Sequence, residues 1–145
     1  MIGDRLRIIA TDFSDAILER ARKGFYSWID VNRGLPAALL AKYFIKQDAG
    51  WRIKPEIRGM VEFRQGNLAN PWPLLPPLDL VFLRNVLIYF SVDTKKKVLS
   101  GVRTVLKPDG YLFLGSSETA MNVDTAFETV SIGKTLCYQL RPKAS

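Results

Sequence analysis

Residues 78–90 read "LDLVFLRNVLIYF", and this stretch decides the fold. Its first six residues, Leu78–Leu83, form a continuous apolar run, which is typical of a strand buried on both faces of a parallel sheet. Arg84 and Asn85 then interrupt the apolar pattern, although burying a charge or an amide without partners is costly. Ligands of open α/β sheets bind at the carboxyl ends of the strands. The sequence therefore predicts that this polar pair lies where a strand ends and a binding crevice opens.

Strand and helix patterns alternate on both sides of this stretch. Before it, an apolar β-branched run predicts a strand, and the next segment predicts a helix that Ser14 caps and Gly24 ends. After it, Ser91 caps another helix, whose apolar residues recur at helical spacing. The alternation predicts an α/β fold with a mostly parallel sheet and an antiparallel C-terminal hairpin. The remaining predicted elements are strands at 5–11 and 111–115, a helix at 35–44, a rigid loop at 69–79 and a hairpin that turns at Gly133.

Length and composition predict one domain over residues 1–145, and the strand patterns at about 45–66 predict a small β-subdomain within it. The 145 residues are 48% hydrophobic and 24% charged, which suits a single globular core. No apolar stretch approaches the ~20 residues that span a bilayer. Charges within the first twelve residues argue against a signal peptide, so we expect a cytoplasmic protein without membrane insertion.

The residue types exclude several kinds of site. The chain has no histidine, which excludes a Ser/His/Asp triad and the commonest zinc ligand. Its one cysteine, Cys137, lies in an apolar run, where we expect buried filler, and we expect no metal site. The net charge of +7 permits nucleic-acid binding, but the basic residues are dispersed rather than interleaved with exposed aromatics. We therefore expect a solvated surface with an affinity for acidic partners, and no nucleic acid.

Two further polar positions follow predicted strands. Asp12 ends the first strand, where an acidic residue of a nucleotide-binding domain accepts hydrogen bonds from ribose hydroxyls. A turn or helix-cap aspartate is an equal alternative. Asn67 and Leu68 follow the strand "MVEFRQ", and an amide beside an apolar side chain suits an adenine ring. Asparagine is also common in turns, so both interpretations of this pair stay open.

Five segments occur together in the order and spacing of one protein family. They are "ATDFSDAILERARKGFY", "LPAALLAKYF", "VEFRQGNLANPWP", "LDLVFLRNVLIYF" and "LKPDGYLFLGSSE". In these segments the chain resembles the S-adenosylmethionine-binding domain of CheR-type chemotaxis methyltransferases, from about residue 6 to residue 140. The resemblance implies a Rossmann-like methyltransferase sheet, with S-adenosyl-L-methionine as cofactor and S-adenosyl-L-homocysteine as product.

The resemblance also implies which residues bind the cofactor. Asp12 matches the aspartate that binds the adenosine ribose, and Asn67 and Leu68 match the pair beside the adenine. Arg84 and Asn85 match an Arg-Asn pair that lines the cofactor pocket near the methionine part. These five residues are the expected cofactor site.

Enzymes of this family methylate glutamate side chains on the cytoplasmic domains of methyl-accepting chemoreceptors. A sulfonium methyl group is already activated and a glutamate is ionised at neutral pH, so the reaction needs alignment rather than a histidine base. Tyr89 matches a tyrosine beside the methyl-transfer site, and Arg84 can orient the incoming carboxylate, so these two are the expected catalytic residues. Alternatively, Arg84 faces the cofactor or pairs with a structural carboxylate such as Asp79.

The chain departs from the family pattern at its start. Family members carry a strand with a Gly-rich turn before the position of Asp12, whereas 11 residues precede Asp12 here and the chain has no G-x-G sequence. We therefore expect a sheet truncated before that strand, with open inner edges at 5–11 and 78–83. Three alternatives follow from the missing strand. The strands at 5–11 and 78–83 pair with each other, a second copy of the chain fills the gap between them, or the chain is a fragment of a longer protein. We expect self-association, and little or no S-adenosylhomocysteine binding by this chain alone.

The sequence leaves more than one function open. The leading hypothesis is glutamate O-methylation of chemoreceptors, incomplete in this chain. The alternative is a non-catalytic module that binds a receptor or signalling partner. A small-molecule or nucleic-acid methyltransferase is less favoured, because the chain has no NPPY-like sequence and no aromatic stacking platform. The short loop "IKQDAGWRIKPEIRG" resembles that of family members which do not dock on the receptor's tail.

Overall fold

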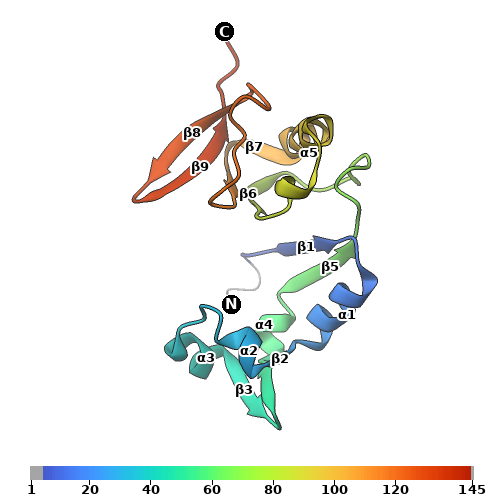
Figure 1. Ribbon diagram of the computed structural model, residues 1–145, viewed down its shortest axis with the longest axis vertical. Helices are drawn as coiled ribbons and strands as arrows, with labels where there is room; N and C mark the ends of the chain where they lie inside the picture. The colour runs from blue at the N-terminus through green and yellow to red at the C-terminus, as the bar shows by residue number, and fades with distance from the viewer. Residues whose placement is uncertain (1–4, 145) are drawn as a thin grey trace. The chain divides into compact units, whose positions relative to one another are not determined.

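The computed structural model describes residues 5–144, which fall into two compact units, Met1–Asn67 and Leu68–Ser145 (Figure 1). Each unit is built from its own sheets. Among residues 5–144, no helix combines the length and the hydropathy needed to cross a bilayer.

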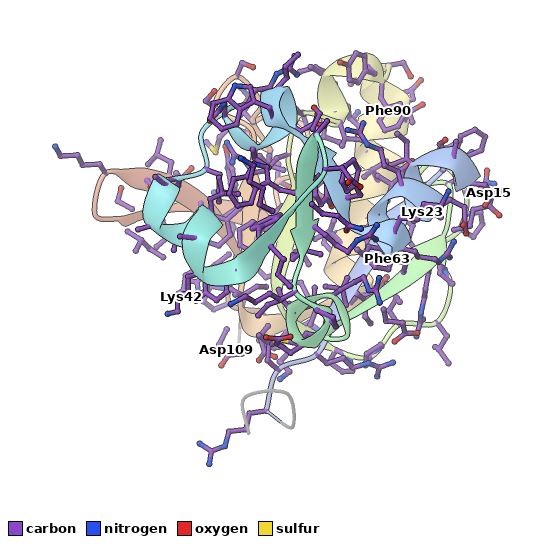
Figure 2. All side chains as sticks on the ribbon, turned by 90° about the horizontal axis from the view of Figure 1, so that it is seen from below. Asp15, Lys23, Lys42, Phe63, Phe90 and Asp109 are labelled. Atoms are coloured by element: carbon purple, nitrogen blue, oxygen red, sulfur yellow. The ribbon has the colours of Figure 1, made fainter. Side chains whose placement is uncertain are left out.

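The first unit begins with a strand, a helix and a parallel strand pair. β1 (Ile8–Asp12) pairs in parallel with β5 (Val61–Gln65), so that Asp12 lies opposite Gln65. The helix α1 (Asp15–Lys23), whose ends are labelled in Figure 2, is capped by the Ser14 hydroxyl, which accepts from the Ile17 N–H at 3.4 Å. Gly24 ends the helix at a φ of 62°, a conformation that glycine adopts without strain. The predicted strand and helix are confirmed.

A small antiparallel sheet of order β2-β4-β3 completes the first unit. It contains β2 (Phe25–Ser27), β3 (Phe44–Gln47) and β4 (Gly50–Ile53). The predicted β-subdomain at 45–66 overlaps this sheet only in part, because β2 joins from earlier in the chain and β5 pairs with β1 instead. A strand of three residues is too short to show an alternating pattern, and alternation does not identify a strand's partner. The short helices of this unit are α2 (Trp28–Val31), α3 (Ala37–Tyr43) and α4 (Pro55–Arg58).

The second unit is one sheet of order β6-β7-β9-β8 with a helix on one face (Figure 1). β6 and β7 run parallel, and β9 is antiparallel to both of its neighbours, as the predicted hairpin requires. The hairpin turns at Gly133, where φ is 59°. The elements of the second unit are β6 (Leu78–Leu83), the 3-10 helix η2 (Leu87–Tyr89), α5 (Val92–Val105), β7 (Leu106–Leu114), β8 (Phe127–Ile132) and β9 (Thr135–Leu140).

The strand predicted at 111–115 begins earlier in the structure, at Leu106, before the "KPDG" segment of residues 107–110. The structure extends β7 through it, but the pairing with β6 is interrupted there. Leu106 lies opposite Leu78, and the next partner pair is Tyr111 with Leu80. The proline and glycine therefore produce an irregularity within the strand rather than a separate turn.

The core of the second unit lies between α5 and one face of the sheet. Val98, Leu99 and Val102 of α5 are fully buried, as is Leu112 of β7. The predicted apolar stripe of this helix is thereby confirmed, and burial of such side chains stabilises the fold by roughly 1.5–3 kcal/mol each. Cys137 is buried in the same unit, as expected for a filler residue.

The proline-rich loop is anchored to α5 by a tryptophan. The Trp72 indole N–H donates to the Leu68 carbonyl at 3.2 Å, and the ring packs on Gly101 of α5. A Cβ atom on Gly101 would lie 2.6 Å from Trp72 Nε1, which is closer than real Cβ contacts allow. Glycine is unfavourable inside a helix, so its presence here is explained by this close packing.

The outer face of β6 is exposed, which corrects the prediction of a strand buried on both faces. Leu83 is buried, whereas Leu80 and Phe82 are 51% and 68% exposed. The Phe82 ring stacks on Phe113 of β7 at a centroid distance of 5.0 Å, so the two rings form an apolar face. Among residues 5–144, β7 is the only strand that pairs with β6. An apolar face beside an open strand edge favours association.

Replacing Gly101 with alanine is expected to destabilise the second unit, although alanine has a higher helix propensity than glycine. Alanine would gain ~1 kcal/mol in an unhindered helix, but overpacking against Trp72 costs about 1–3 kcal/mol. Urea unfolding of the G101A variant measures the balance. Gly66→Ala is the control, because a Cβ there meets open space. An unchanged or raised stability of G101A would show that Trp72 does not pack as described.

The exposed face of β6 predicts that the chain self-associates at micromolar concentration, and that Phe82→Glu weakens this association. A carboxylate on the stacked pair would have to be desolvated at an interface. Sedimentation velocity of both proteins measures the effect. Leu74→Glu is the control, because Leu74 is 98% exposed in a loop. A monomeric parent chain, or equal association of F82E and the parent, would contradict this role of the β6 face.

Candidate functional site

Asp12 occupies the carboxyl end of β1, as predicted. Its Oδ1 atom accepts a hydrogen bond from the Ser14 N–H at 2.8 Å, so the turn-forming role is real. No hydrogen bond from a described residue reaches its Oδ2 atom. The side chain is half-buried, and its second oxygen remains available to a ligand hydroxyl. The structural and the ligand-binding interpretations of Asp12 are therefore compatible.

Asn67 lies near Asp12 within the first unit. The Gly66 N–H donates to the Asp12 carbonyl at 3.0 Å, which continues the β1–β5 pairing to the residue before Asn67. Asn67 and Asp12 therefore follow neighbouring parallel strands at the same sheet edge. Leu68 begins the second unit, where it is half-buried and packs against that unit's core.

Arg84 and Asn85 follow directly on the carboxyl end of β6, as predicted. Both are exposed, and Asn85 has a φ of 60° in the left-handed region, which costs a non-glycine residue free energy. Arg84 has no ion pair among the described residues. Asp79, the alternative structural partner, instead pairs with Lys107 at 2.7 Å. The guanidinium of Arg84 is therefore available for an acidic ligand.

Glu118 holds the loop that carries Arg84 and Asn85. Its Oε1 atom accepts from the Asn85 N–H at 2.5 Å and from the Gly115 N–H at 2.8 Å, and Oε2 accepts from the Ile88 N–H at 3.2 Å. One carboxylate thus ties the end of β7 to the loop after β6. These bonds hold Asn85 in its strained conformation.

The same contacts shift the acidity of Glu118. Burial alone would raise its pKa, but hydrogen bonds from the backbone N–H groups of Gly115, Asn85, Ile88 and Leu87 outweigh burial and lower the pKa. The carboxylate is therefore ionised at neutral pH and binds the loop through charge-assisted hydrogen bonds.

Gly115 lets this loop approach closely. A Cβ on Gly115 would lie 2.7 Å from Glu118 Oε1 and would overlap Asn85 Oδ1. Any side chain at this position would push the carboxylate or the amide away. Sequence reasoning assigned no role to Glu118 or Gly115, although "LGSSE" was part of the family resemblance. A carboxylate shortly after a strand-ending glycine was the signal that could have indicated the contact.

Tyr89 ends the 3-10 helix η2 and is 80% exposed. Its N–H donates to the Val86 carbonyl at 3.2 Å, one residue beyond the Ile88 N–H that Glu118 holds. The structure thus brings Arg84, Asn85 and Tyr89 together on one fixed loop of the second unit. Asp12 and Asn67 form a separate group in the first unit.

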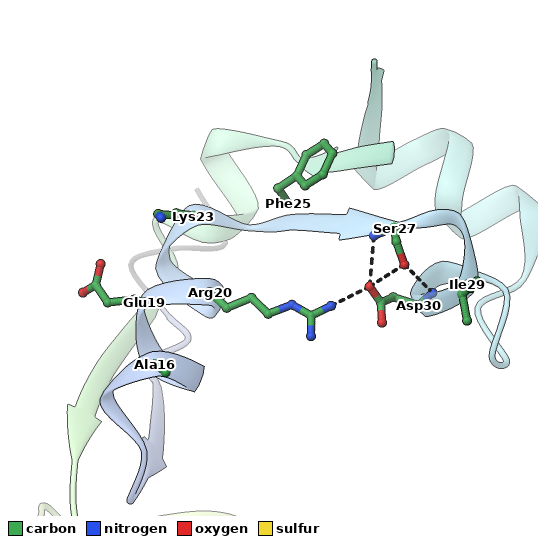
Figure 3. A pocket seen from close by; sticks show the side chains of 8 residues that line it. All are labelled: Ala16, Glu19, Arg20, Lys23, Phe25, Ser27, Ile29 and Asp30. Atoms are coloured by element: carbon green, nitrogen blue, oxygen red, sulfur yellow. Dashed lines mark hydrogen bonds and ion pairs between the residues drawn. The ribbon is translucent and has the colours of Figure 1, made fainter. Parts of the chain in front are cut away.

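The first unit also has an open hollow of about 600 Å³ beside α1 (Figure 3). The Arg20 guanidinium crosses it to Asp30 at 2.5 Å, and Asp30 also accepts from the Ser27 N–H and hydroxyl. The pKa of Asp30 is lowered, first by the hydrogen bond from the Ser27 side chain and then by its other partners. None of the sequence-predicted site residues lines this hollow, and the Arg20 and Asp30 side chains within it neutralise each other.

Glu118→Gln is expected to lower the free energy of unfolding by about 2 kcal/mol at pH 7, because hydrogen bonds to a charged acceptor are lost. A lowered folded pKa means that the stabilisation is present above the unfolded carboxyl pKa of ~4.3 and is lost as the pH falls through the folded value. The parent chain should therefore lose more stability than E118Q between pH 7 and pH 3. Urea unfolding at both pH values measures this difference. Glu128→Gln, which changes the same charge at a carboxylate without a hydrogen bond among described residues, is the control, and equal behaviour of both variants would contradict the prediction.

The sequence of the chain is similar to those of known proteins of one family. A model described as "CheR methyltransferase, SAM binding domain" matches residues 2–136. Chemotaxis protein methyltransferase 1 of Pseudomonas aeruginosa is 40% identical over 137 residues, which are 94% of this chain and 50% of that protein. Chemotaxis protein methyltransferase 1 of Vibrio cholerae is 39% identical over 137 residues, 92% of this chain and 49% of that protein. The chain thus spans about half the length of the curated relatives it matches.

A solved structure also shares the fold. The structure of LepI in complex with SAM matches 93% of this chain and 36% of its own length, with a TM-score of 0.52 and 10% identity. At this identity the likeness supports the fold alone, and it confirms the predicted Rossmann-like α/β class. With the family model covering residues 2–136, the chain belongs to the CheR methyltransferase family through its SAM-binding domain.

Proposed function

We propose that this chain carries part of an S-adenosylmethionine-dependent enzyme that methylates glutamate side chains of chemoreceptors. The observation that carries this proposal is Arg84. This chain belongs to the CheR family, and the exposed guanidinium of its Arg84 has no ion-pair partner among the described residues. Arg84 lies on a loop that hydrogen bonds to Glu118 hold in place. A fixed guanidinium is suited to orient a carboxylate by a bidentate contact.

The residues present fit the cofactor that the family description names. In the first unit, Asp12 retains a free carboxylate oxygen for the ribose hydroxyls, and Asn67 follows the adjacent strand. In the second unit, Gly115 leaves room for the Asn85 amide at the end of β6. We assign Asp12, Asn67 and Leu68 to the adenosine part, and Arg84 and Asn85 to the methionine part.

The chemistry requires little from the protein beyond alignment. When bound, S-adenosylmethionine supplies an activated sulfonium methyl group. Arg84 would hold the acceptor carboxylate, which is ionised at neutral pH, and Tyr89 would border the transfer site with its exposed ring. The product side is a γ-glutamyl methyl ester on the acceptor.

The partners follow from the same assignment. Methyl-accepting chemoreceptors present their glutamates on cytoplasmic domains, so the proposed place of action is the cytoplasm. The alternative, a non-catalytic interaction module, gains no support from relatives that are named as methyltransferases.

A chimera tests this proposal. The half of the P. aeruginosa relative that this chain matches is replaced by the chain, and transfer of a radiolabelled methyl group to receptor-enriched membranes is measured. We expect base-labile methyl ester formation by the chimera. Arg84→Ala should lower the rate by about 100-fold, because acceptor alignment is lost. Arg33→Ala is the control, because Arg33 is likewise exposed and its side chain has no ion pair among the described residues.

Calorimetry with S-adenosylhomocysteine separates binding from turnover. We expect the chimera to bind it and the isolated chain to bind little. A chimera that folds and binds S-adenosylhomocysteine but transfers no methyl group would overturn the proposed function. Equal rates of the R84A and R33A variants would overturn the role of Arg84.

A further inference from the structure

The segment between β6 and the second turn of α5 carries apolar and basic side chains that are exposed, apart from Lys95, which is half-buried. Ile88, Tyr89 and Val92 are 50%, 80% and 58% exposed. Lys95 and Lys96 follow Val92 by three and four residues on the helix and therefore neighbour it, one turn along. We call these five residues the Lys–Tyr surface.

The backbone that carries the Lys–Tyr surface is fixed from both ends. Glu118 accepts from the Ile88 N–H at 3.2 Å, and the Ser91 hydroxyl caps α5 by accepting from the Thr94 N–H at 3.3 Å. Between them, Phe90, which is labelled in Figure 2, is half-buried and packs against the core of the second unit. The exposed side chains therefore start from an ordered backbone, which reduces the entropy lost on binding.

Two other cations of the second unit are neutralised by ion pairs, unlike the lysines of this surface. Arg103 pairs with Asp124 at 3.2 Å, and Lys107 pairs with Asp79 at 2.7 Å. Among the residues that the structure describes, Lys95 and Lys96 form no ion pair. A cationic patch without internal partners is complementary to an acidic ligand, and the tyrosine beside it is a residue type enriched at interfaces.

A lipid surface is the less suitable acidic ligand. Helices that insert into a membrane interface direct an apolar stripe towards the lipid. The apolar stripe of α5 is instead buried in the core through Val98, Leu99 and Val102. The Lys–Tyr surface itself contains three exposed apolar side chains, and two of them, Ile88 and Tyr89, lie in η2.

We propose that the Lys–Tyr surface docks an acidic, glutamate-bearing segment of a partner protein, next to the loop that carries Arg84. The apolar side chains contact the partner's apolar residues, and Lys95 and Lys96 contact its carboxylates. Since the assignment of this partner as the methyl acceptor rests on the proposed function, the surface would then position the substrate and lower its KM. The reacting carboxylate itself is left to Arg84.

Binding is tested with the full chain and a fluorescent 20-residue peptide that carries four glutamates among alanines and leucines. We expect anisotropy to show binding that weakens in high salt and is absent for the glutamine counterpart. Lys96→Glu should weaken binding about threefold to tenfold, because one cation becomes a like charge. Lys134→Glu, on the β8–β9 turn, makes the same charge change and should leave binding unchanged.

The apolar side chains of the Lys–Tyr surface are tested with a second matched pair of variants. Val92→Ser should weaken peptide binding, whereas Ile132→Ser should not, although Ile132 is also exposed, at 47%. Equal effects of K96E and K134E, or of V92S and I132S, would overturn the Lys–Tyr surface. Binding to phosphatidylserine vesicles that depends on Lys96, without binding to the peptide, would overturn the assignment of a protein partner.

The chimera separates this inference from the proposed function. If the surface positions the substrate, K96E raises the KM for receptor membranes and leaves kcat close to that of K134E. Methyl transfer with equal KM values in both variants would overturn the docking surface while the proposed function stands. Peptide binding that depends on Lys96 in a chimera that transfers no methyl group would support the surface and overturn the proposed function.

Discussion

The contact on which the candidate site depends is the Glu118 carboxylate at the junction of β6 and β7. It accepts three backbone N–H groups from two loops that are about 30 residues apart in sequence. Partial burial without these donors would raise the pKa of the carboxyl group, and without the carboxylate the N–H groups would lose a charged acceptor. The contact therefore lowers the pKa of Glu118 and at the same time fixes the conformation of the loop after β6. The orientation of Arg84 and Tyr89 relative to the sheet is a consequence.

Much of this fold could be predicted from sequence because its signals are local. The Ser14 and Ser91 caps, the stop at Gly24 and the turn at Gly133 each act within a few residues of the chain. Partner choice is not local. The three-residue strand β2 and the pairing of β5 with β1 are set by contacts across the chain, and so the limits of the small sheet were predicted only in part.

The candidate site shows the same division. The rule that ligands bind at the carboxyl ends of strands located Asp12, Asn67, Arg84 and Asn85 at strand ends, where the structure has them. Apolar sequence alone could not reveal that β6 is exposed on its outer face, because a continuous apolar run does not state what covers it. The role of Glu118 was missed because its partners are backbone groups, which carry no side-chain signature, so that its position shortly after a strand-ending glycine was the available signal.

The packing of Trp72 on Gly101 has an optical consequence. The Trp72 indole donates to the carbonyl of Leu68, a residue that we assign to the adenosine part of the cofactor site. Its fluorescence depends on this hydrogen bond and on its half-buried environment against α5. Trp28 and the half-buried Trp51 report on the first unit, and Trp28, which is 60% exposed, emits at longer wavelength as a solvated indole does. The chain thus contains an intrinsic spectroscopic reporter beside Leu68, so that events at that position can be followed without a label.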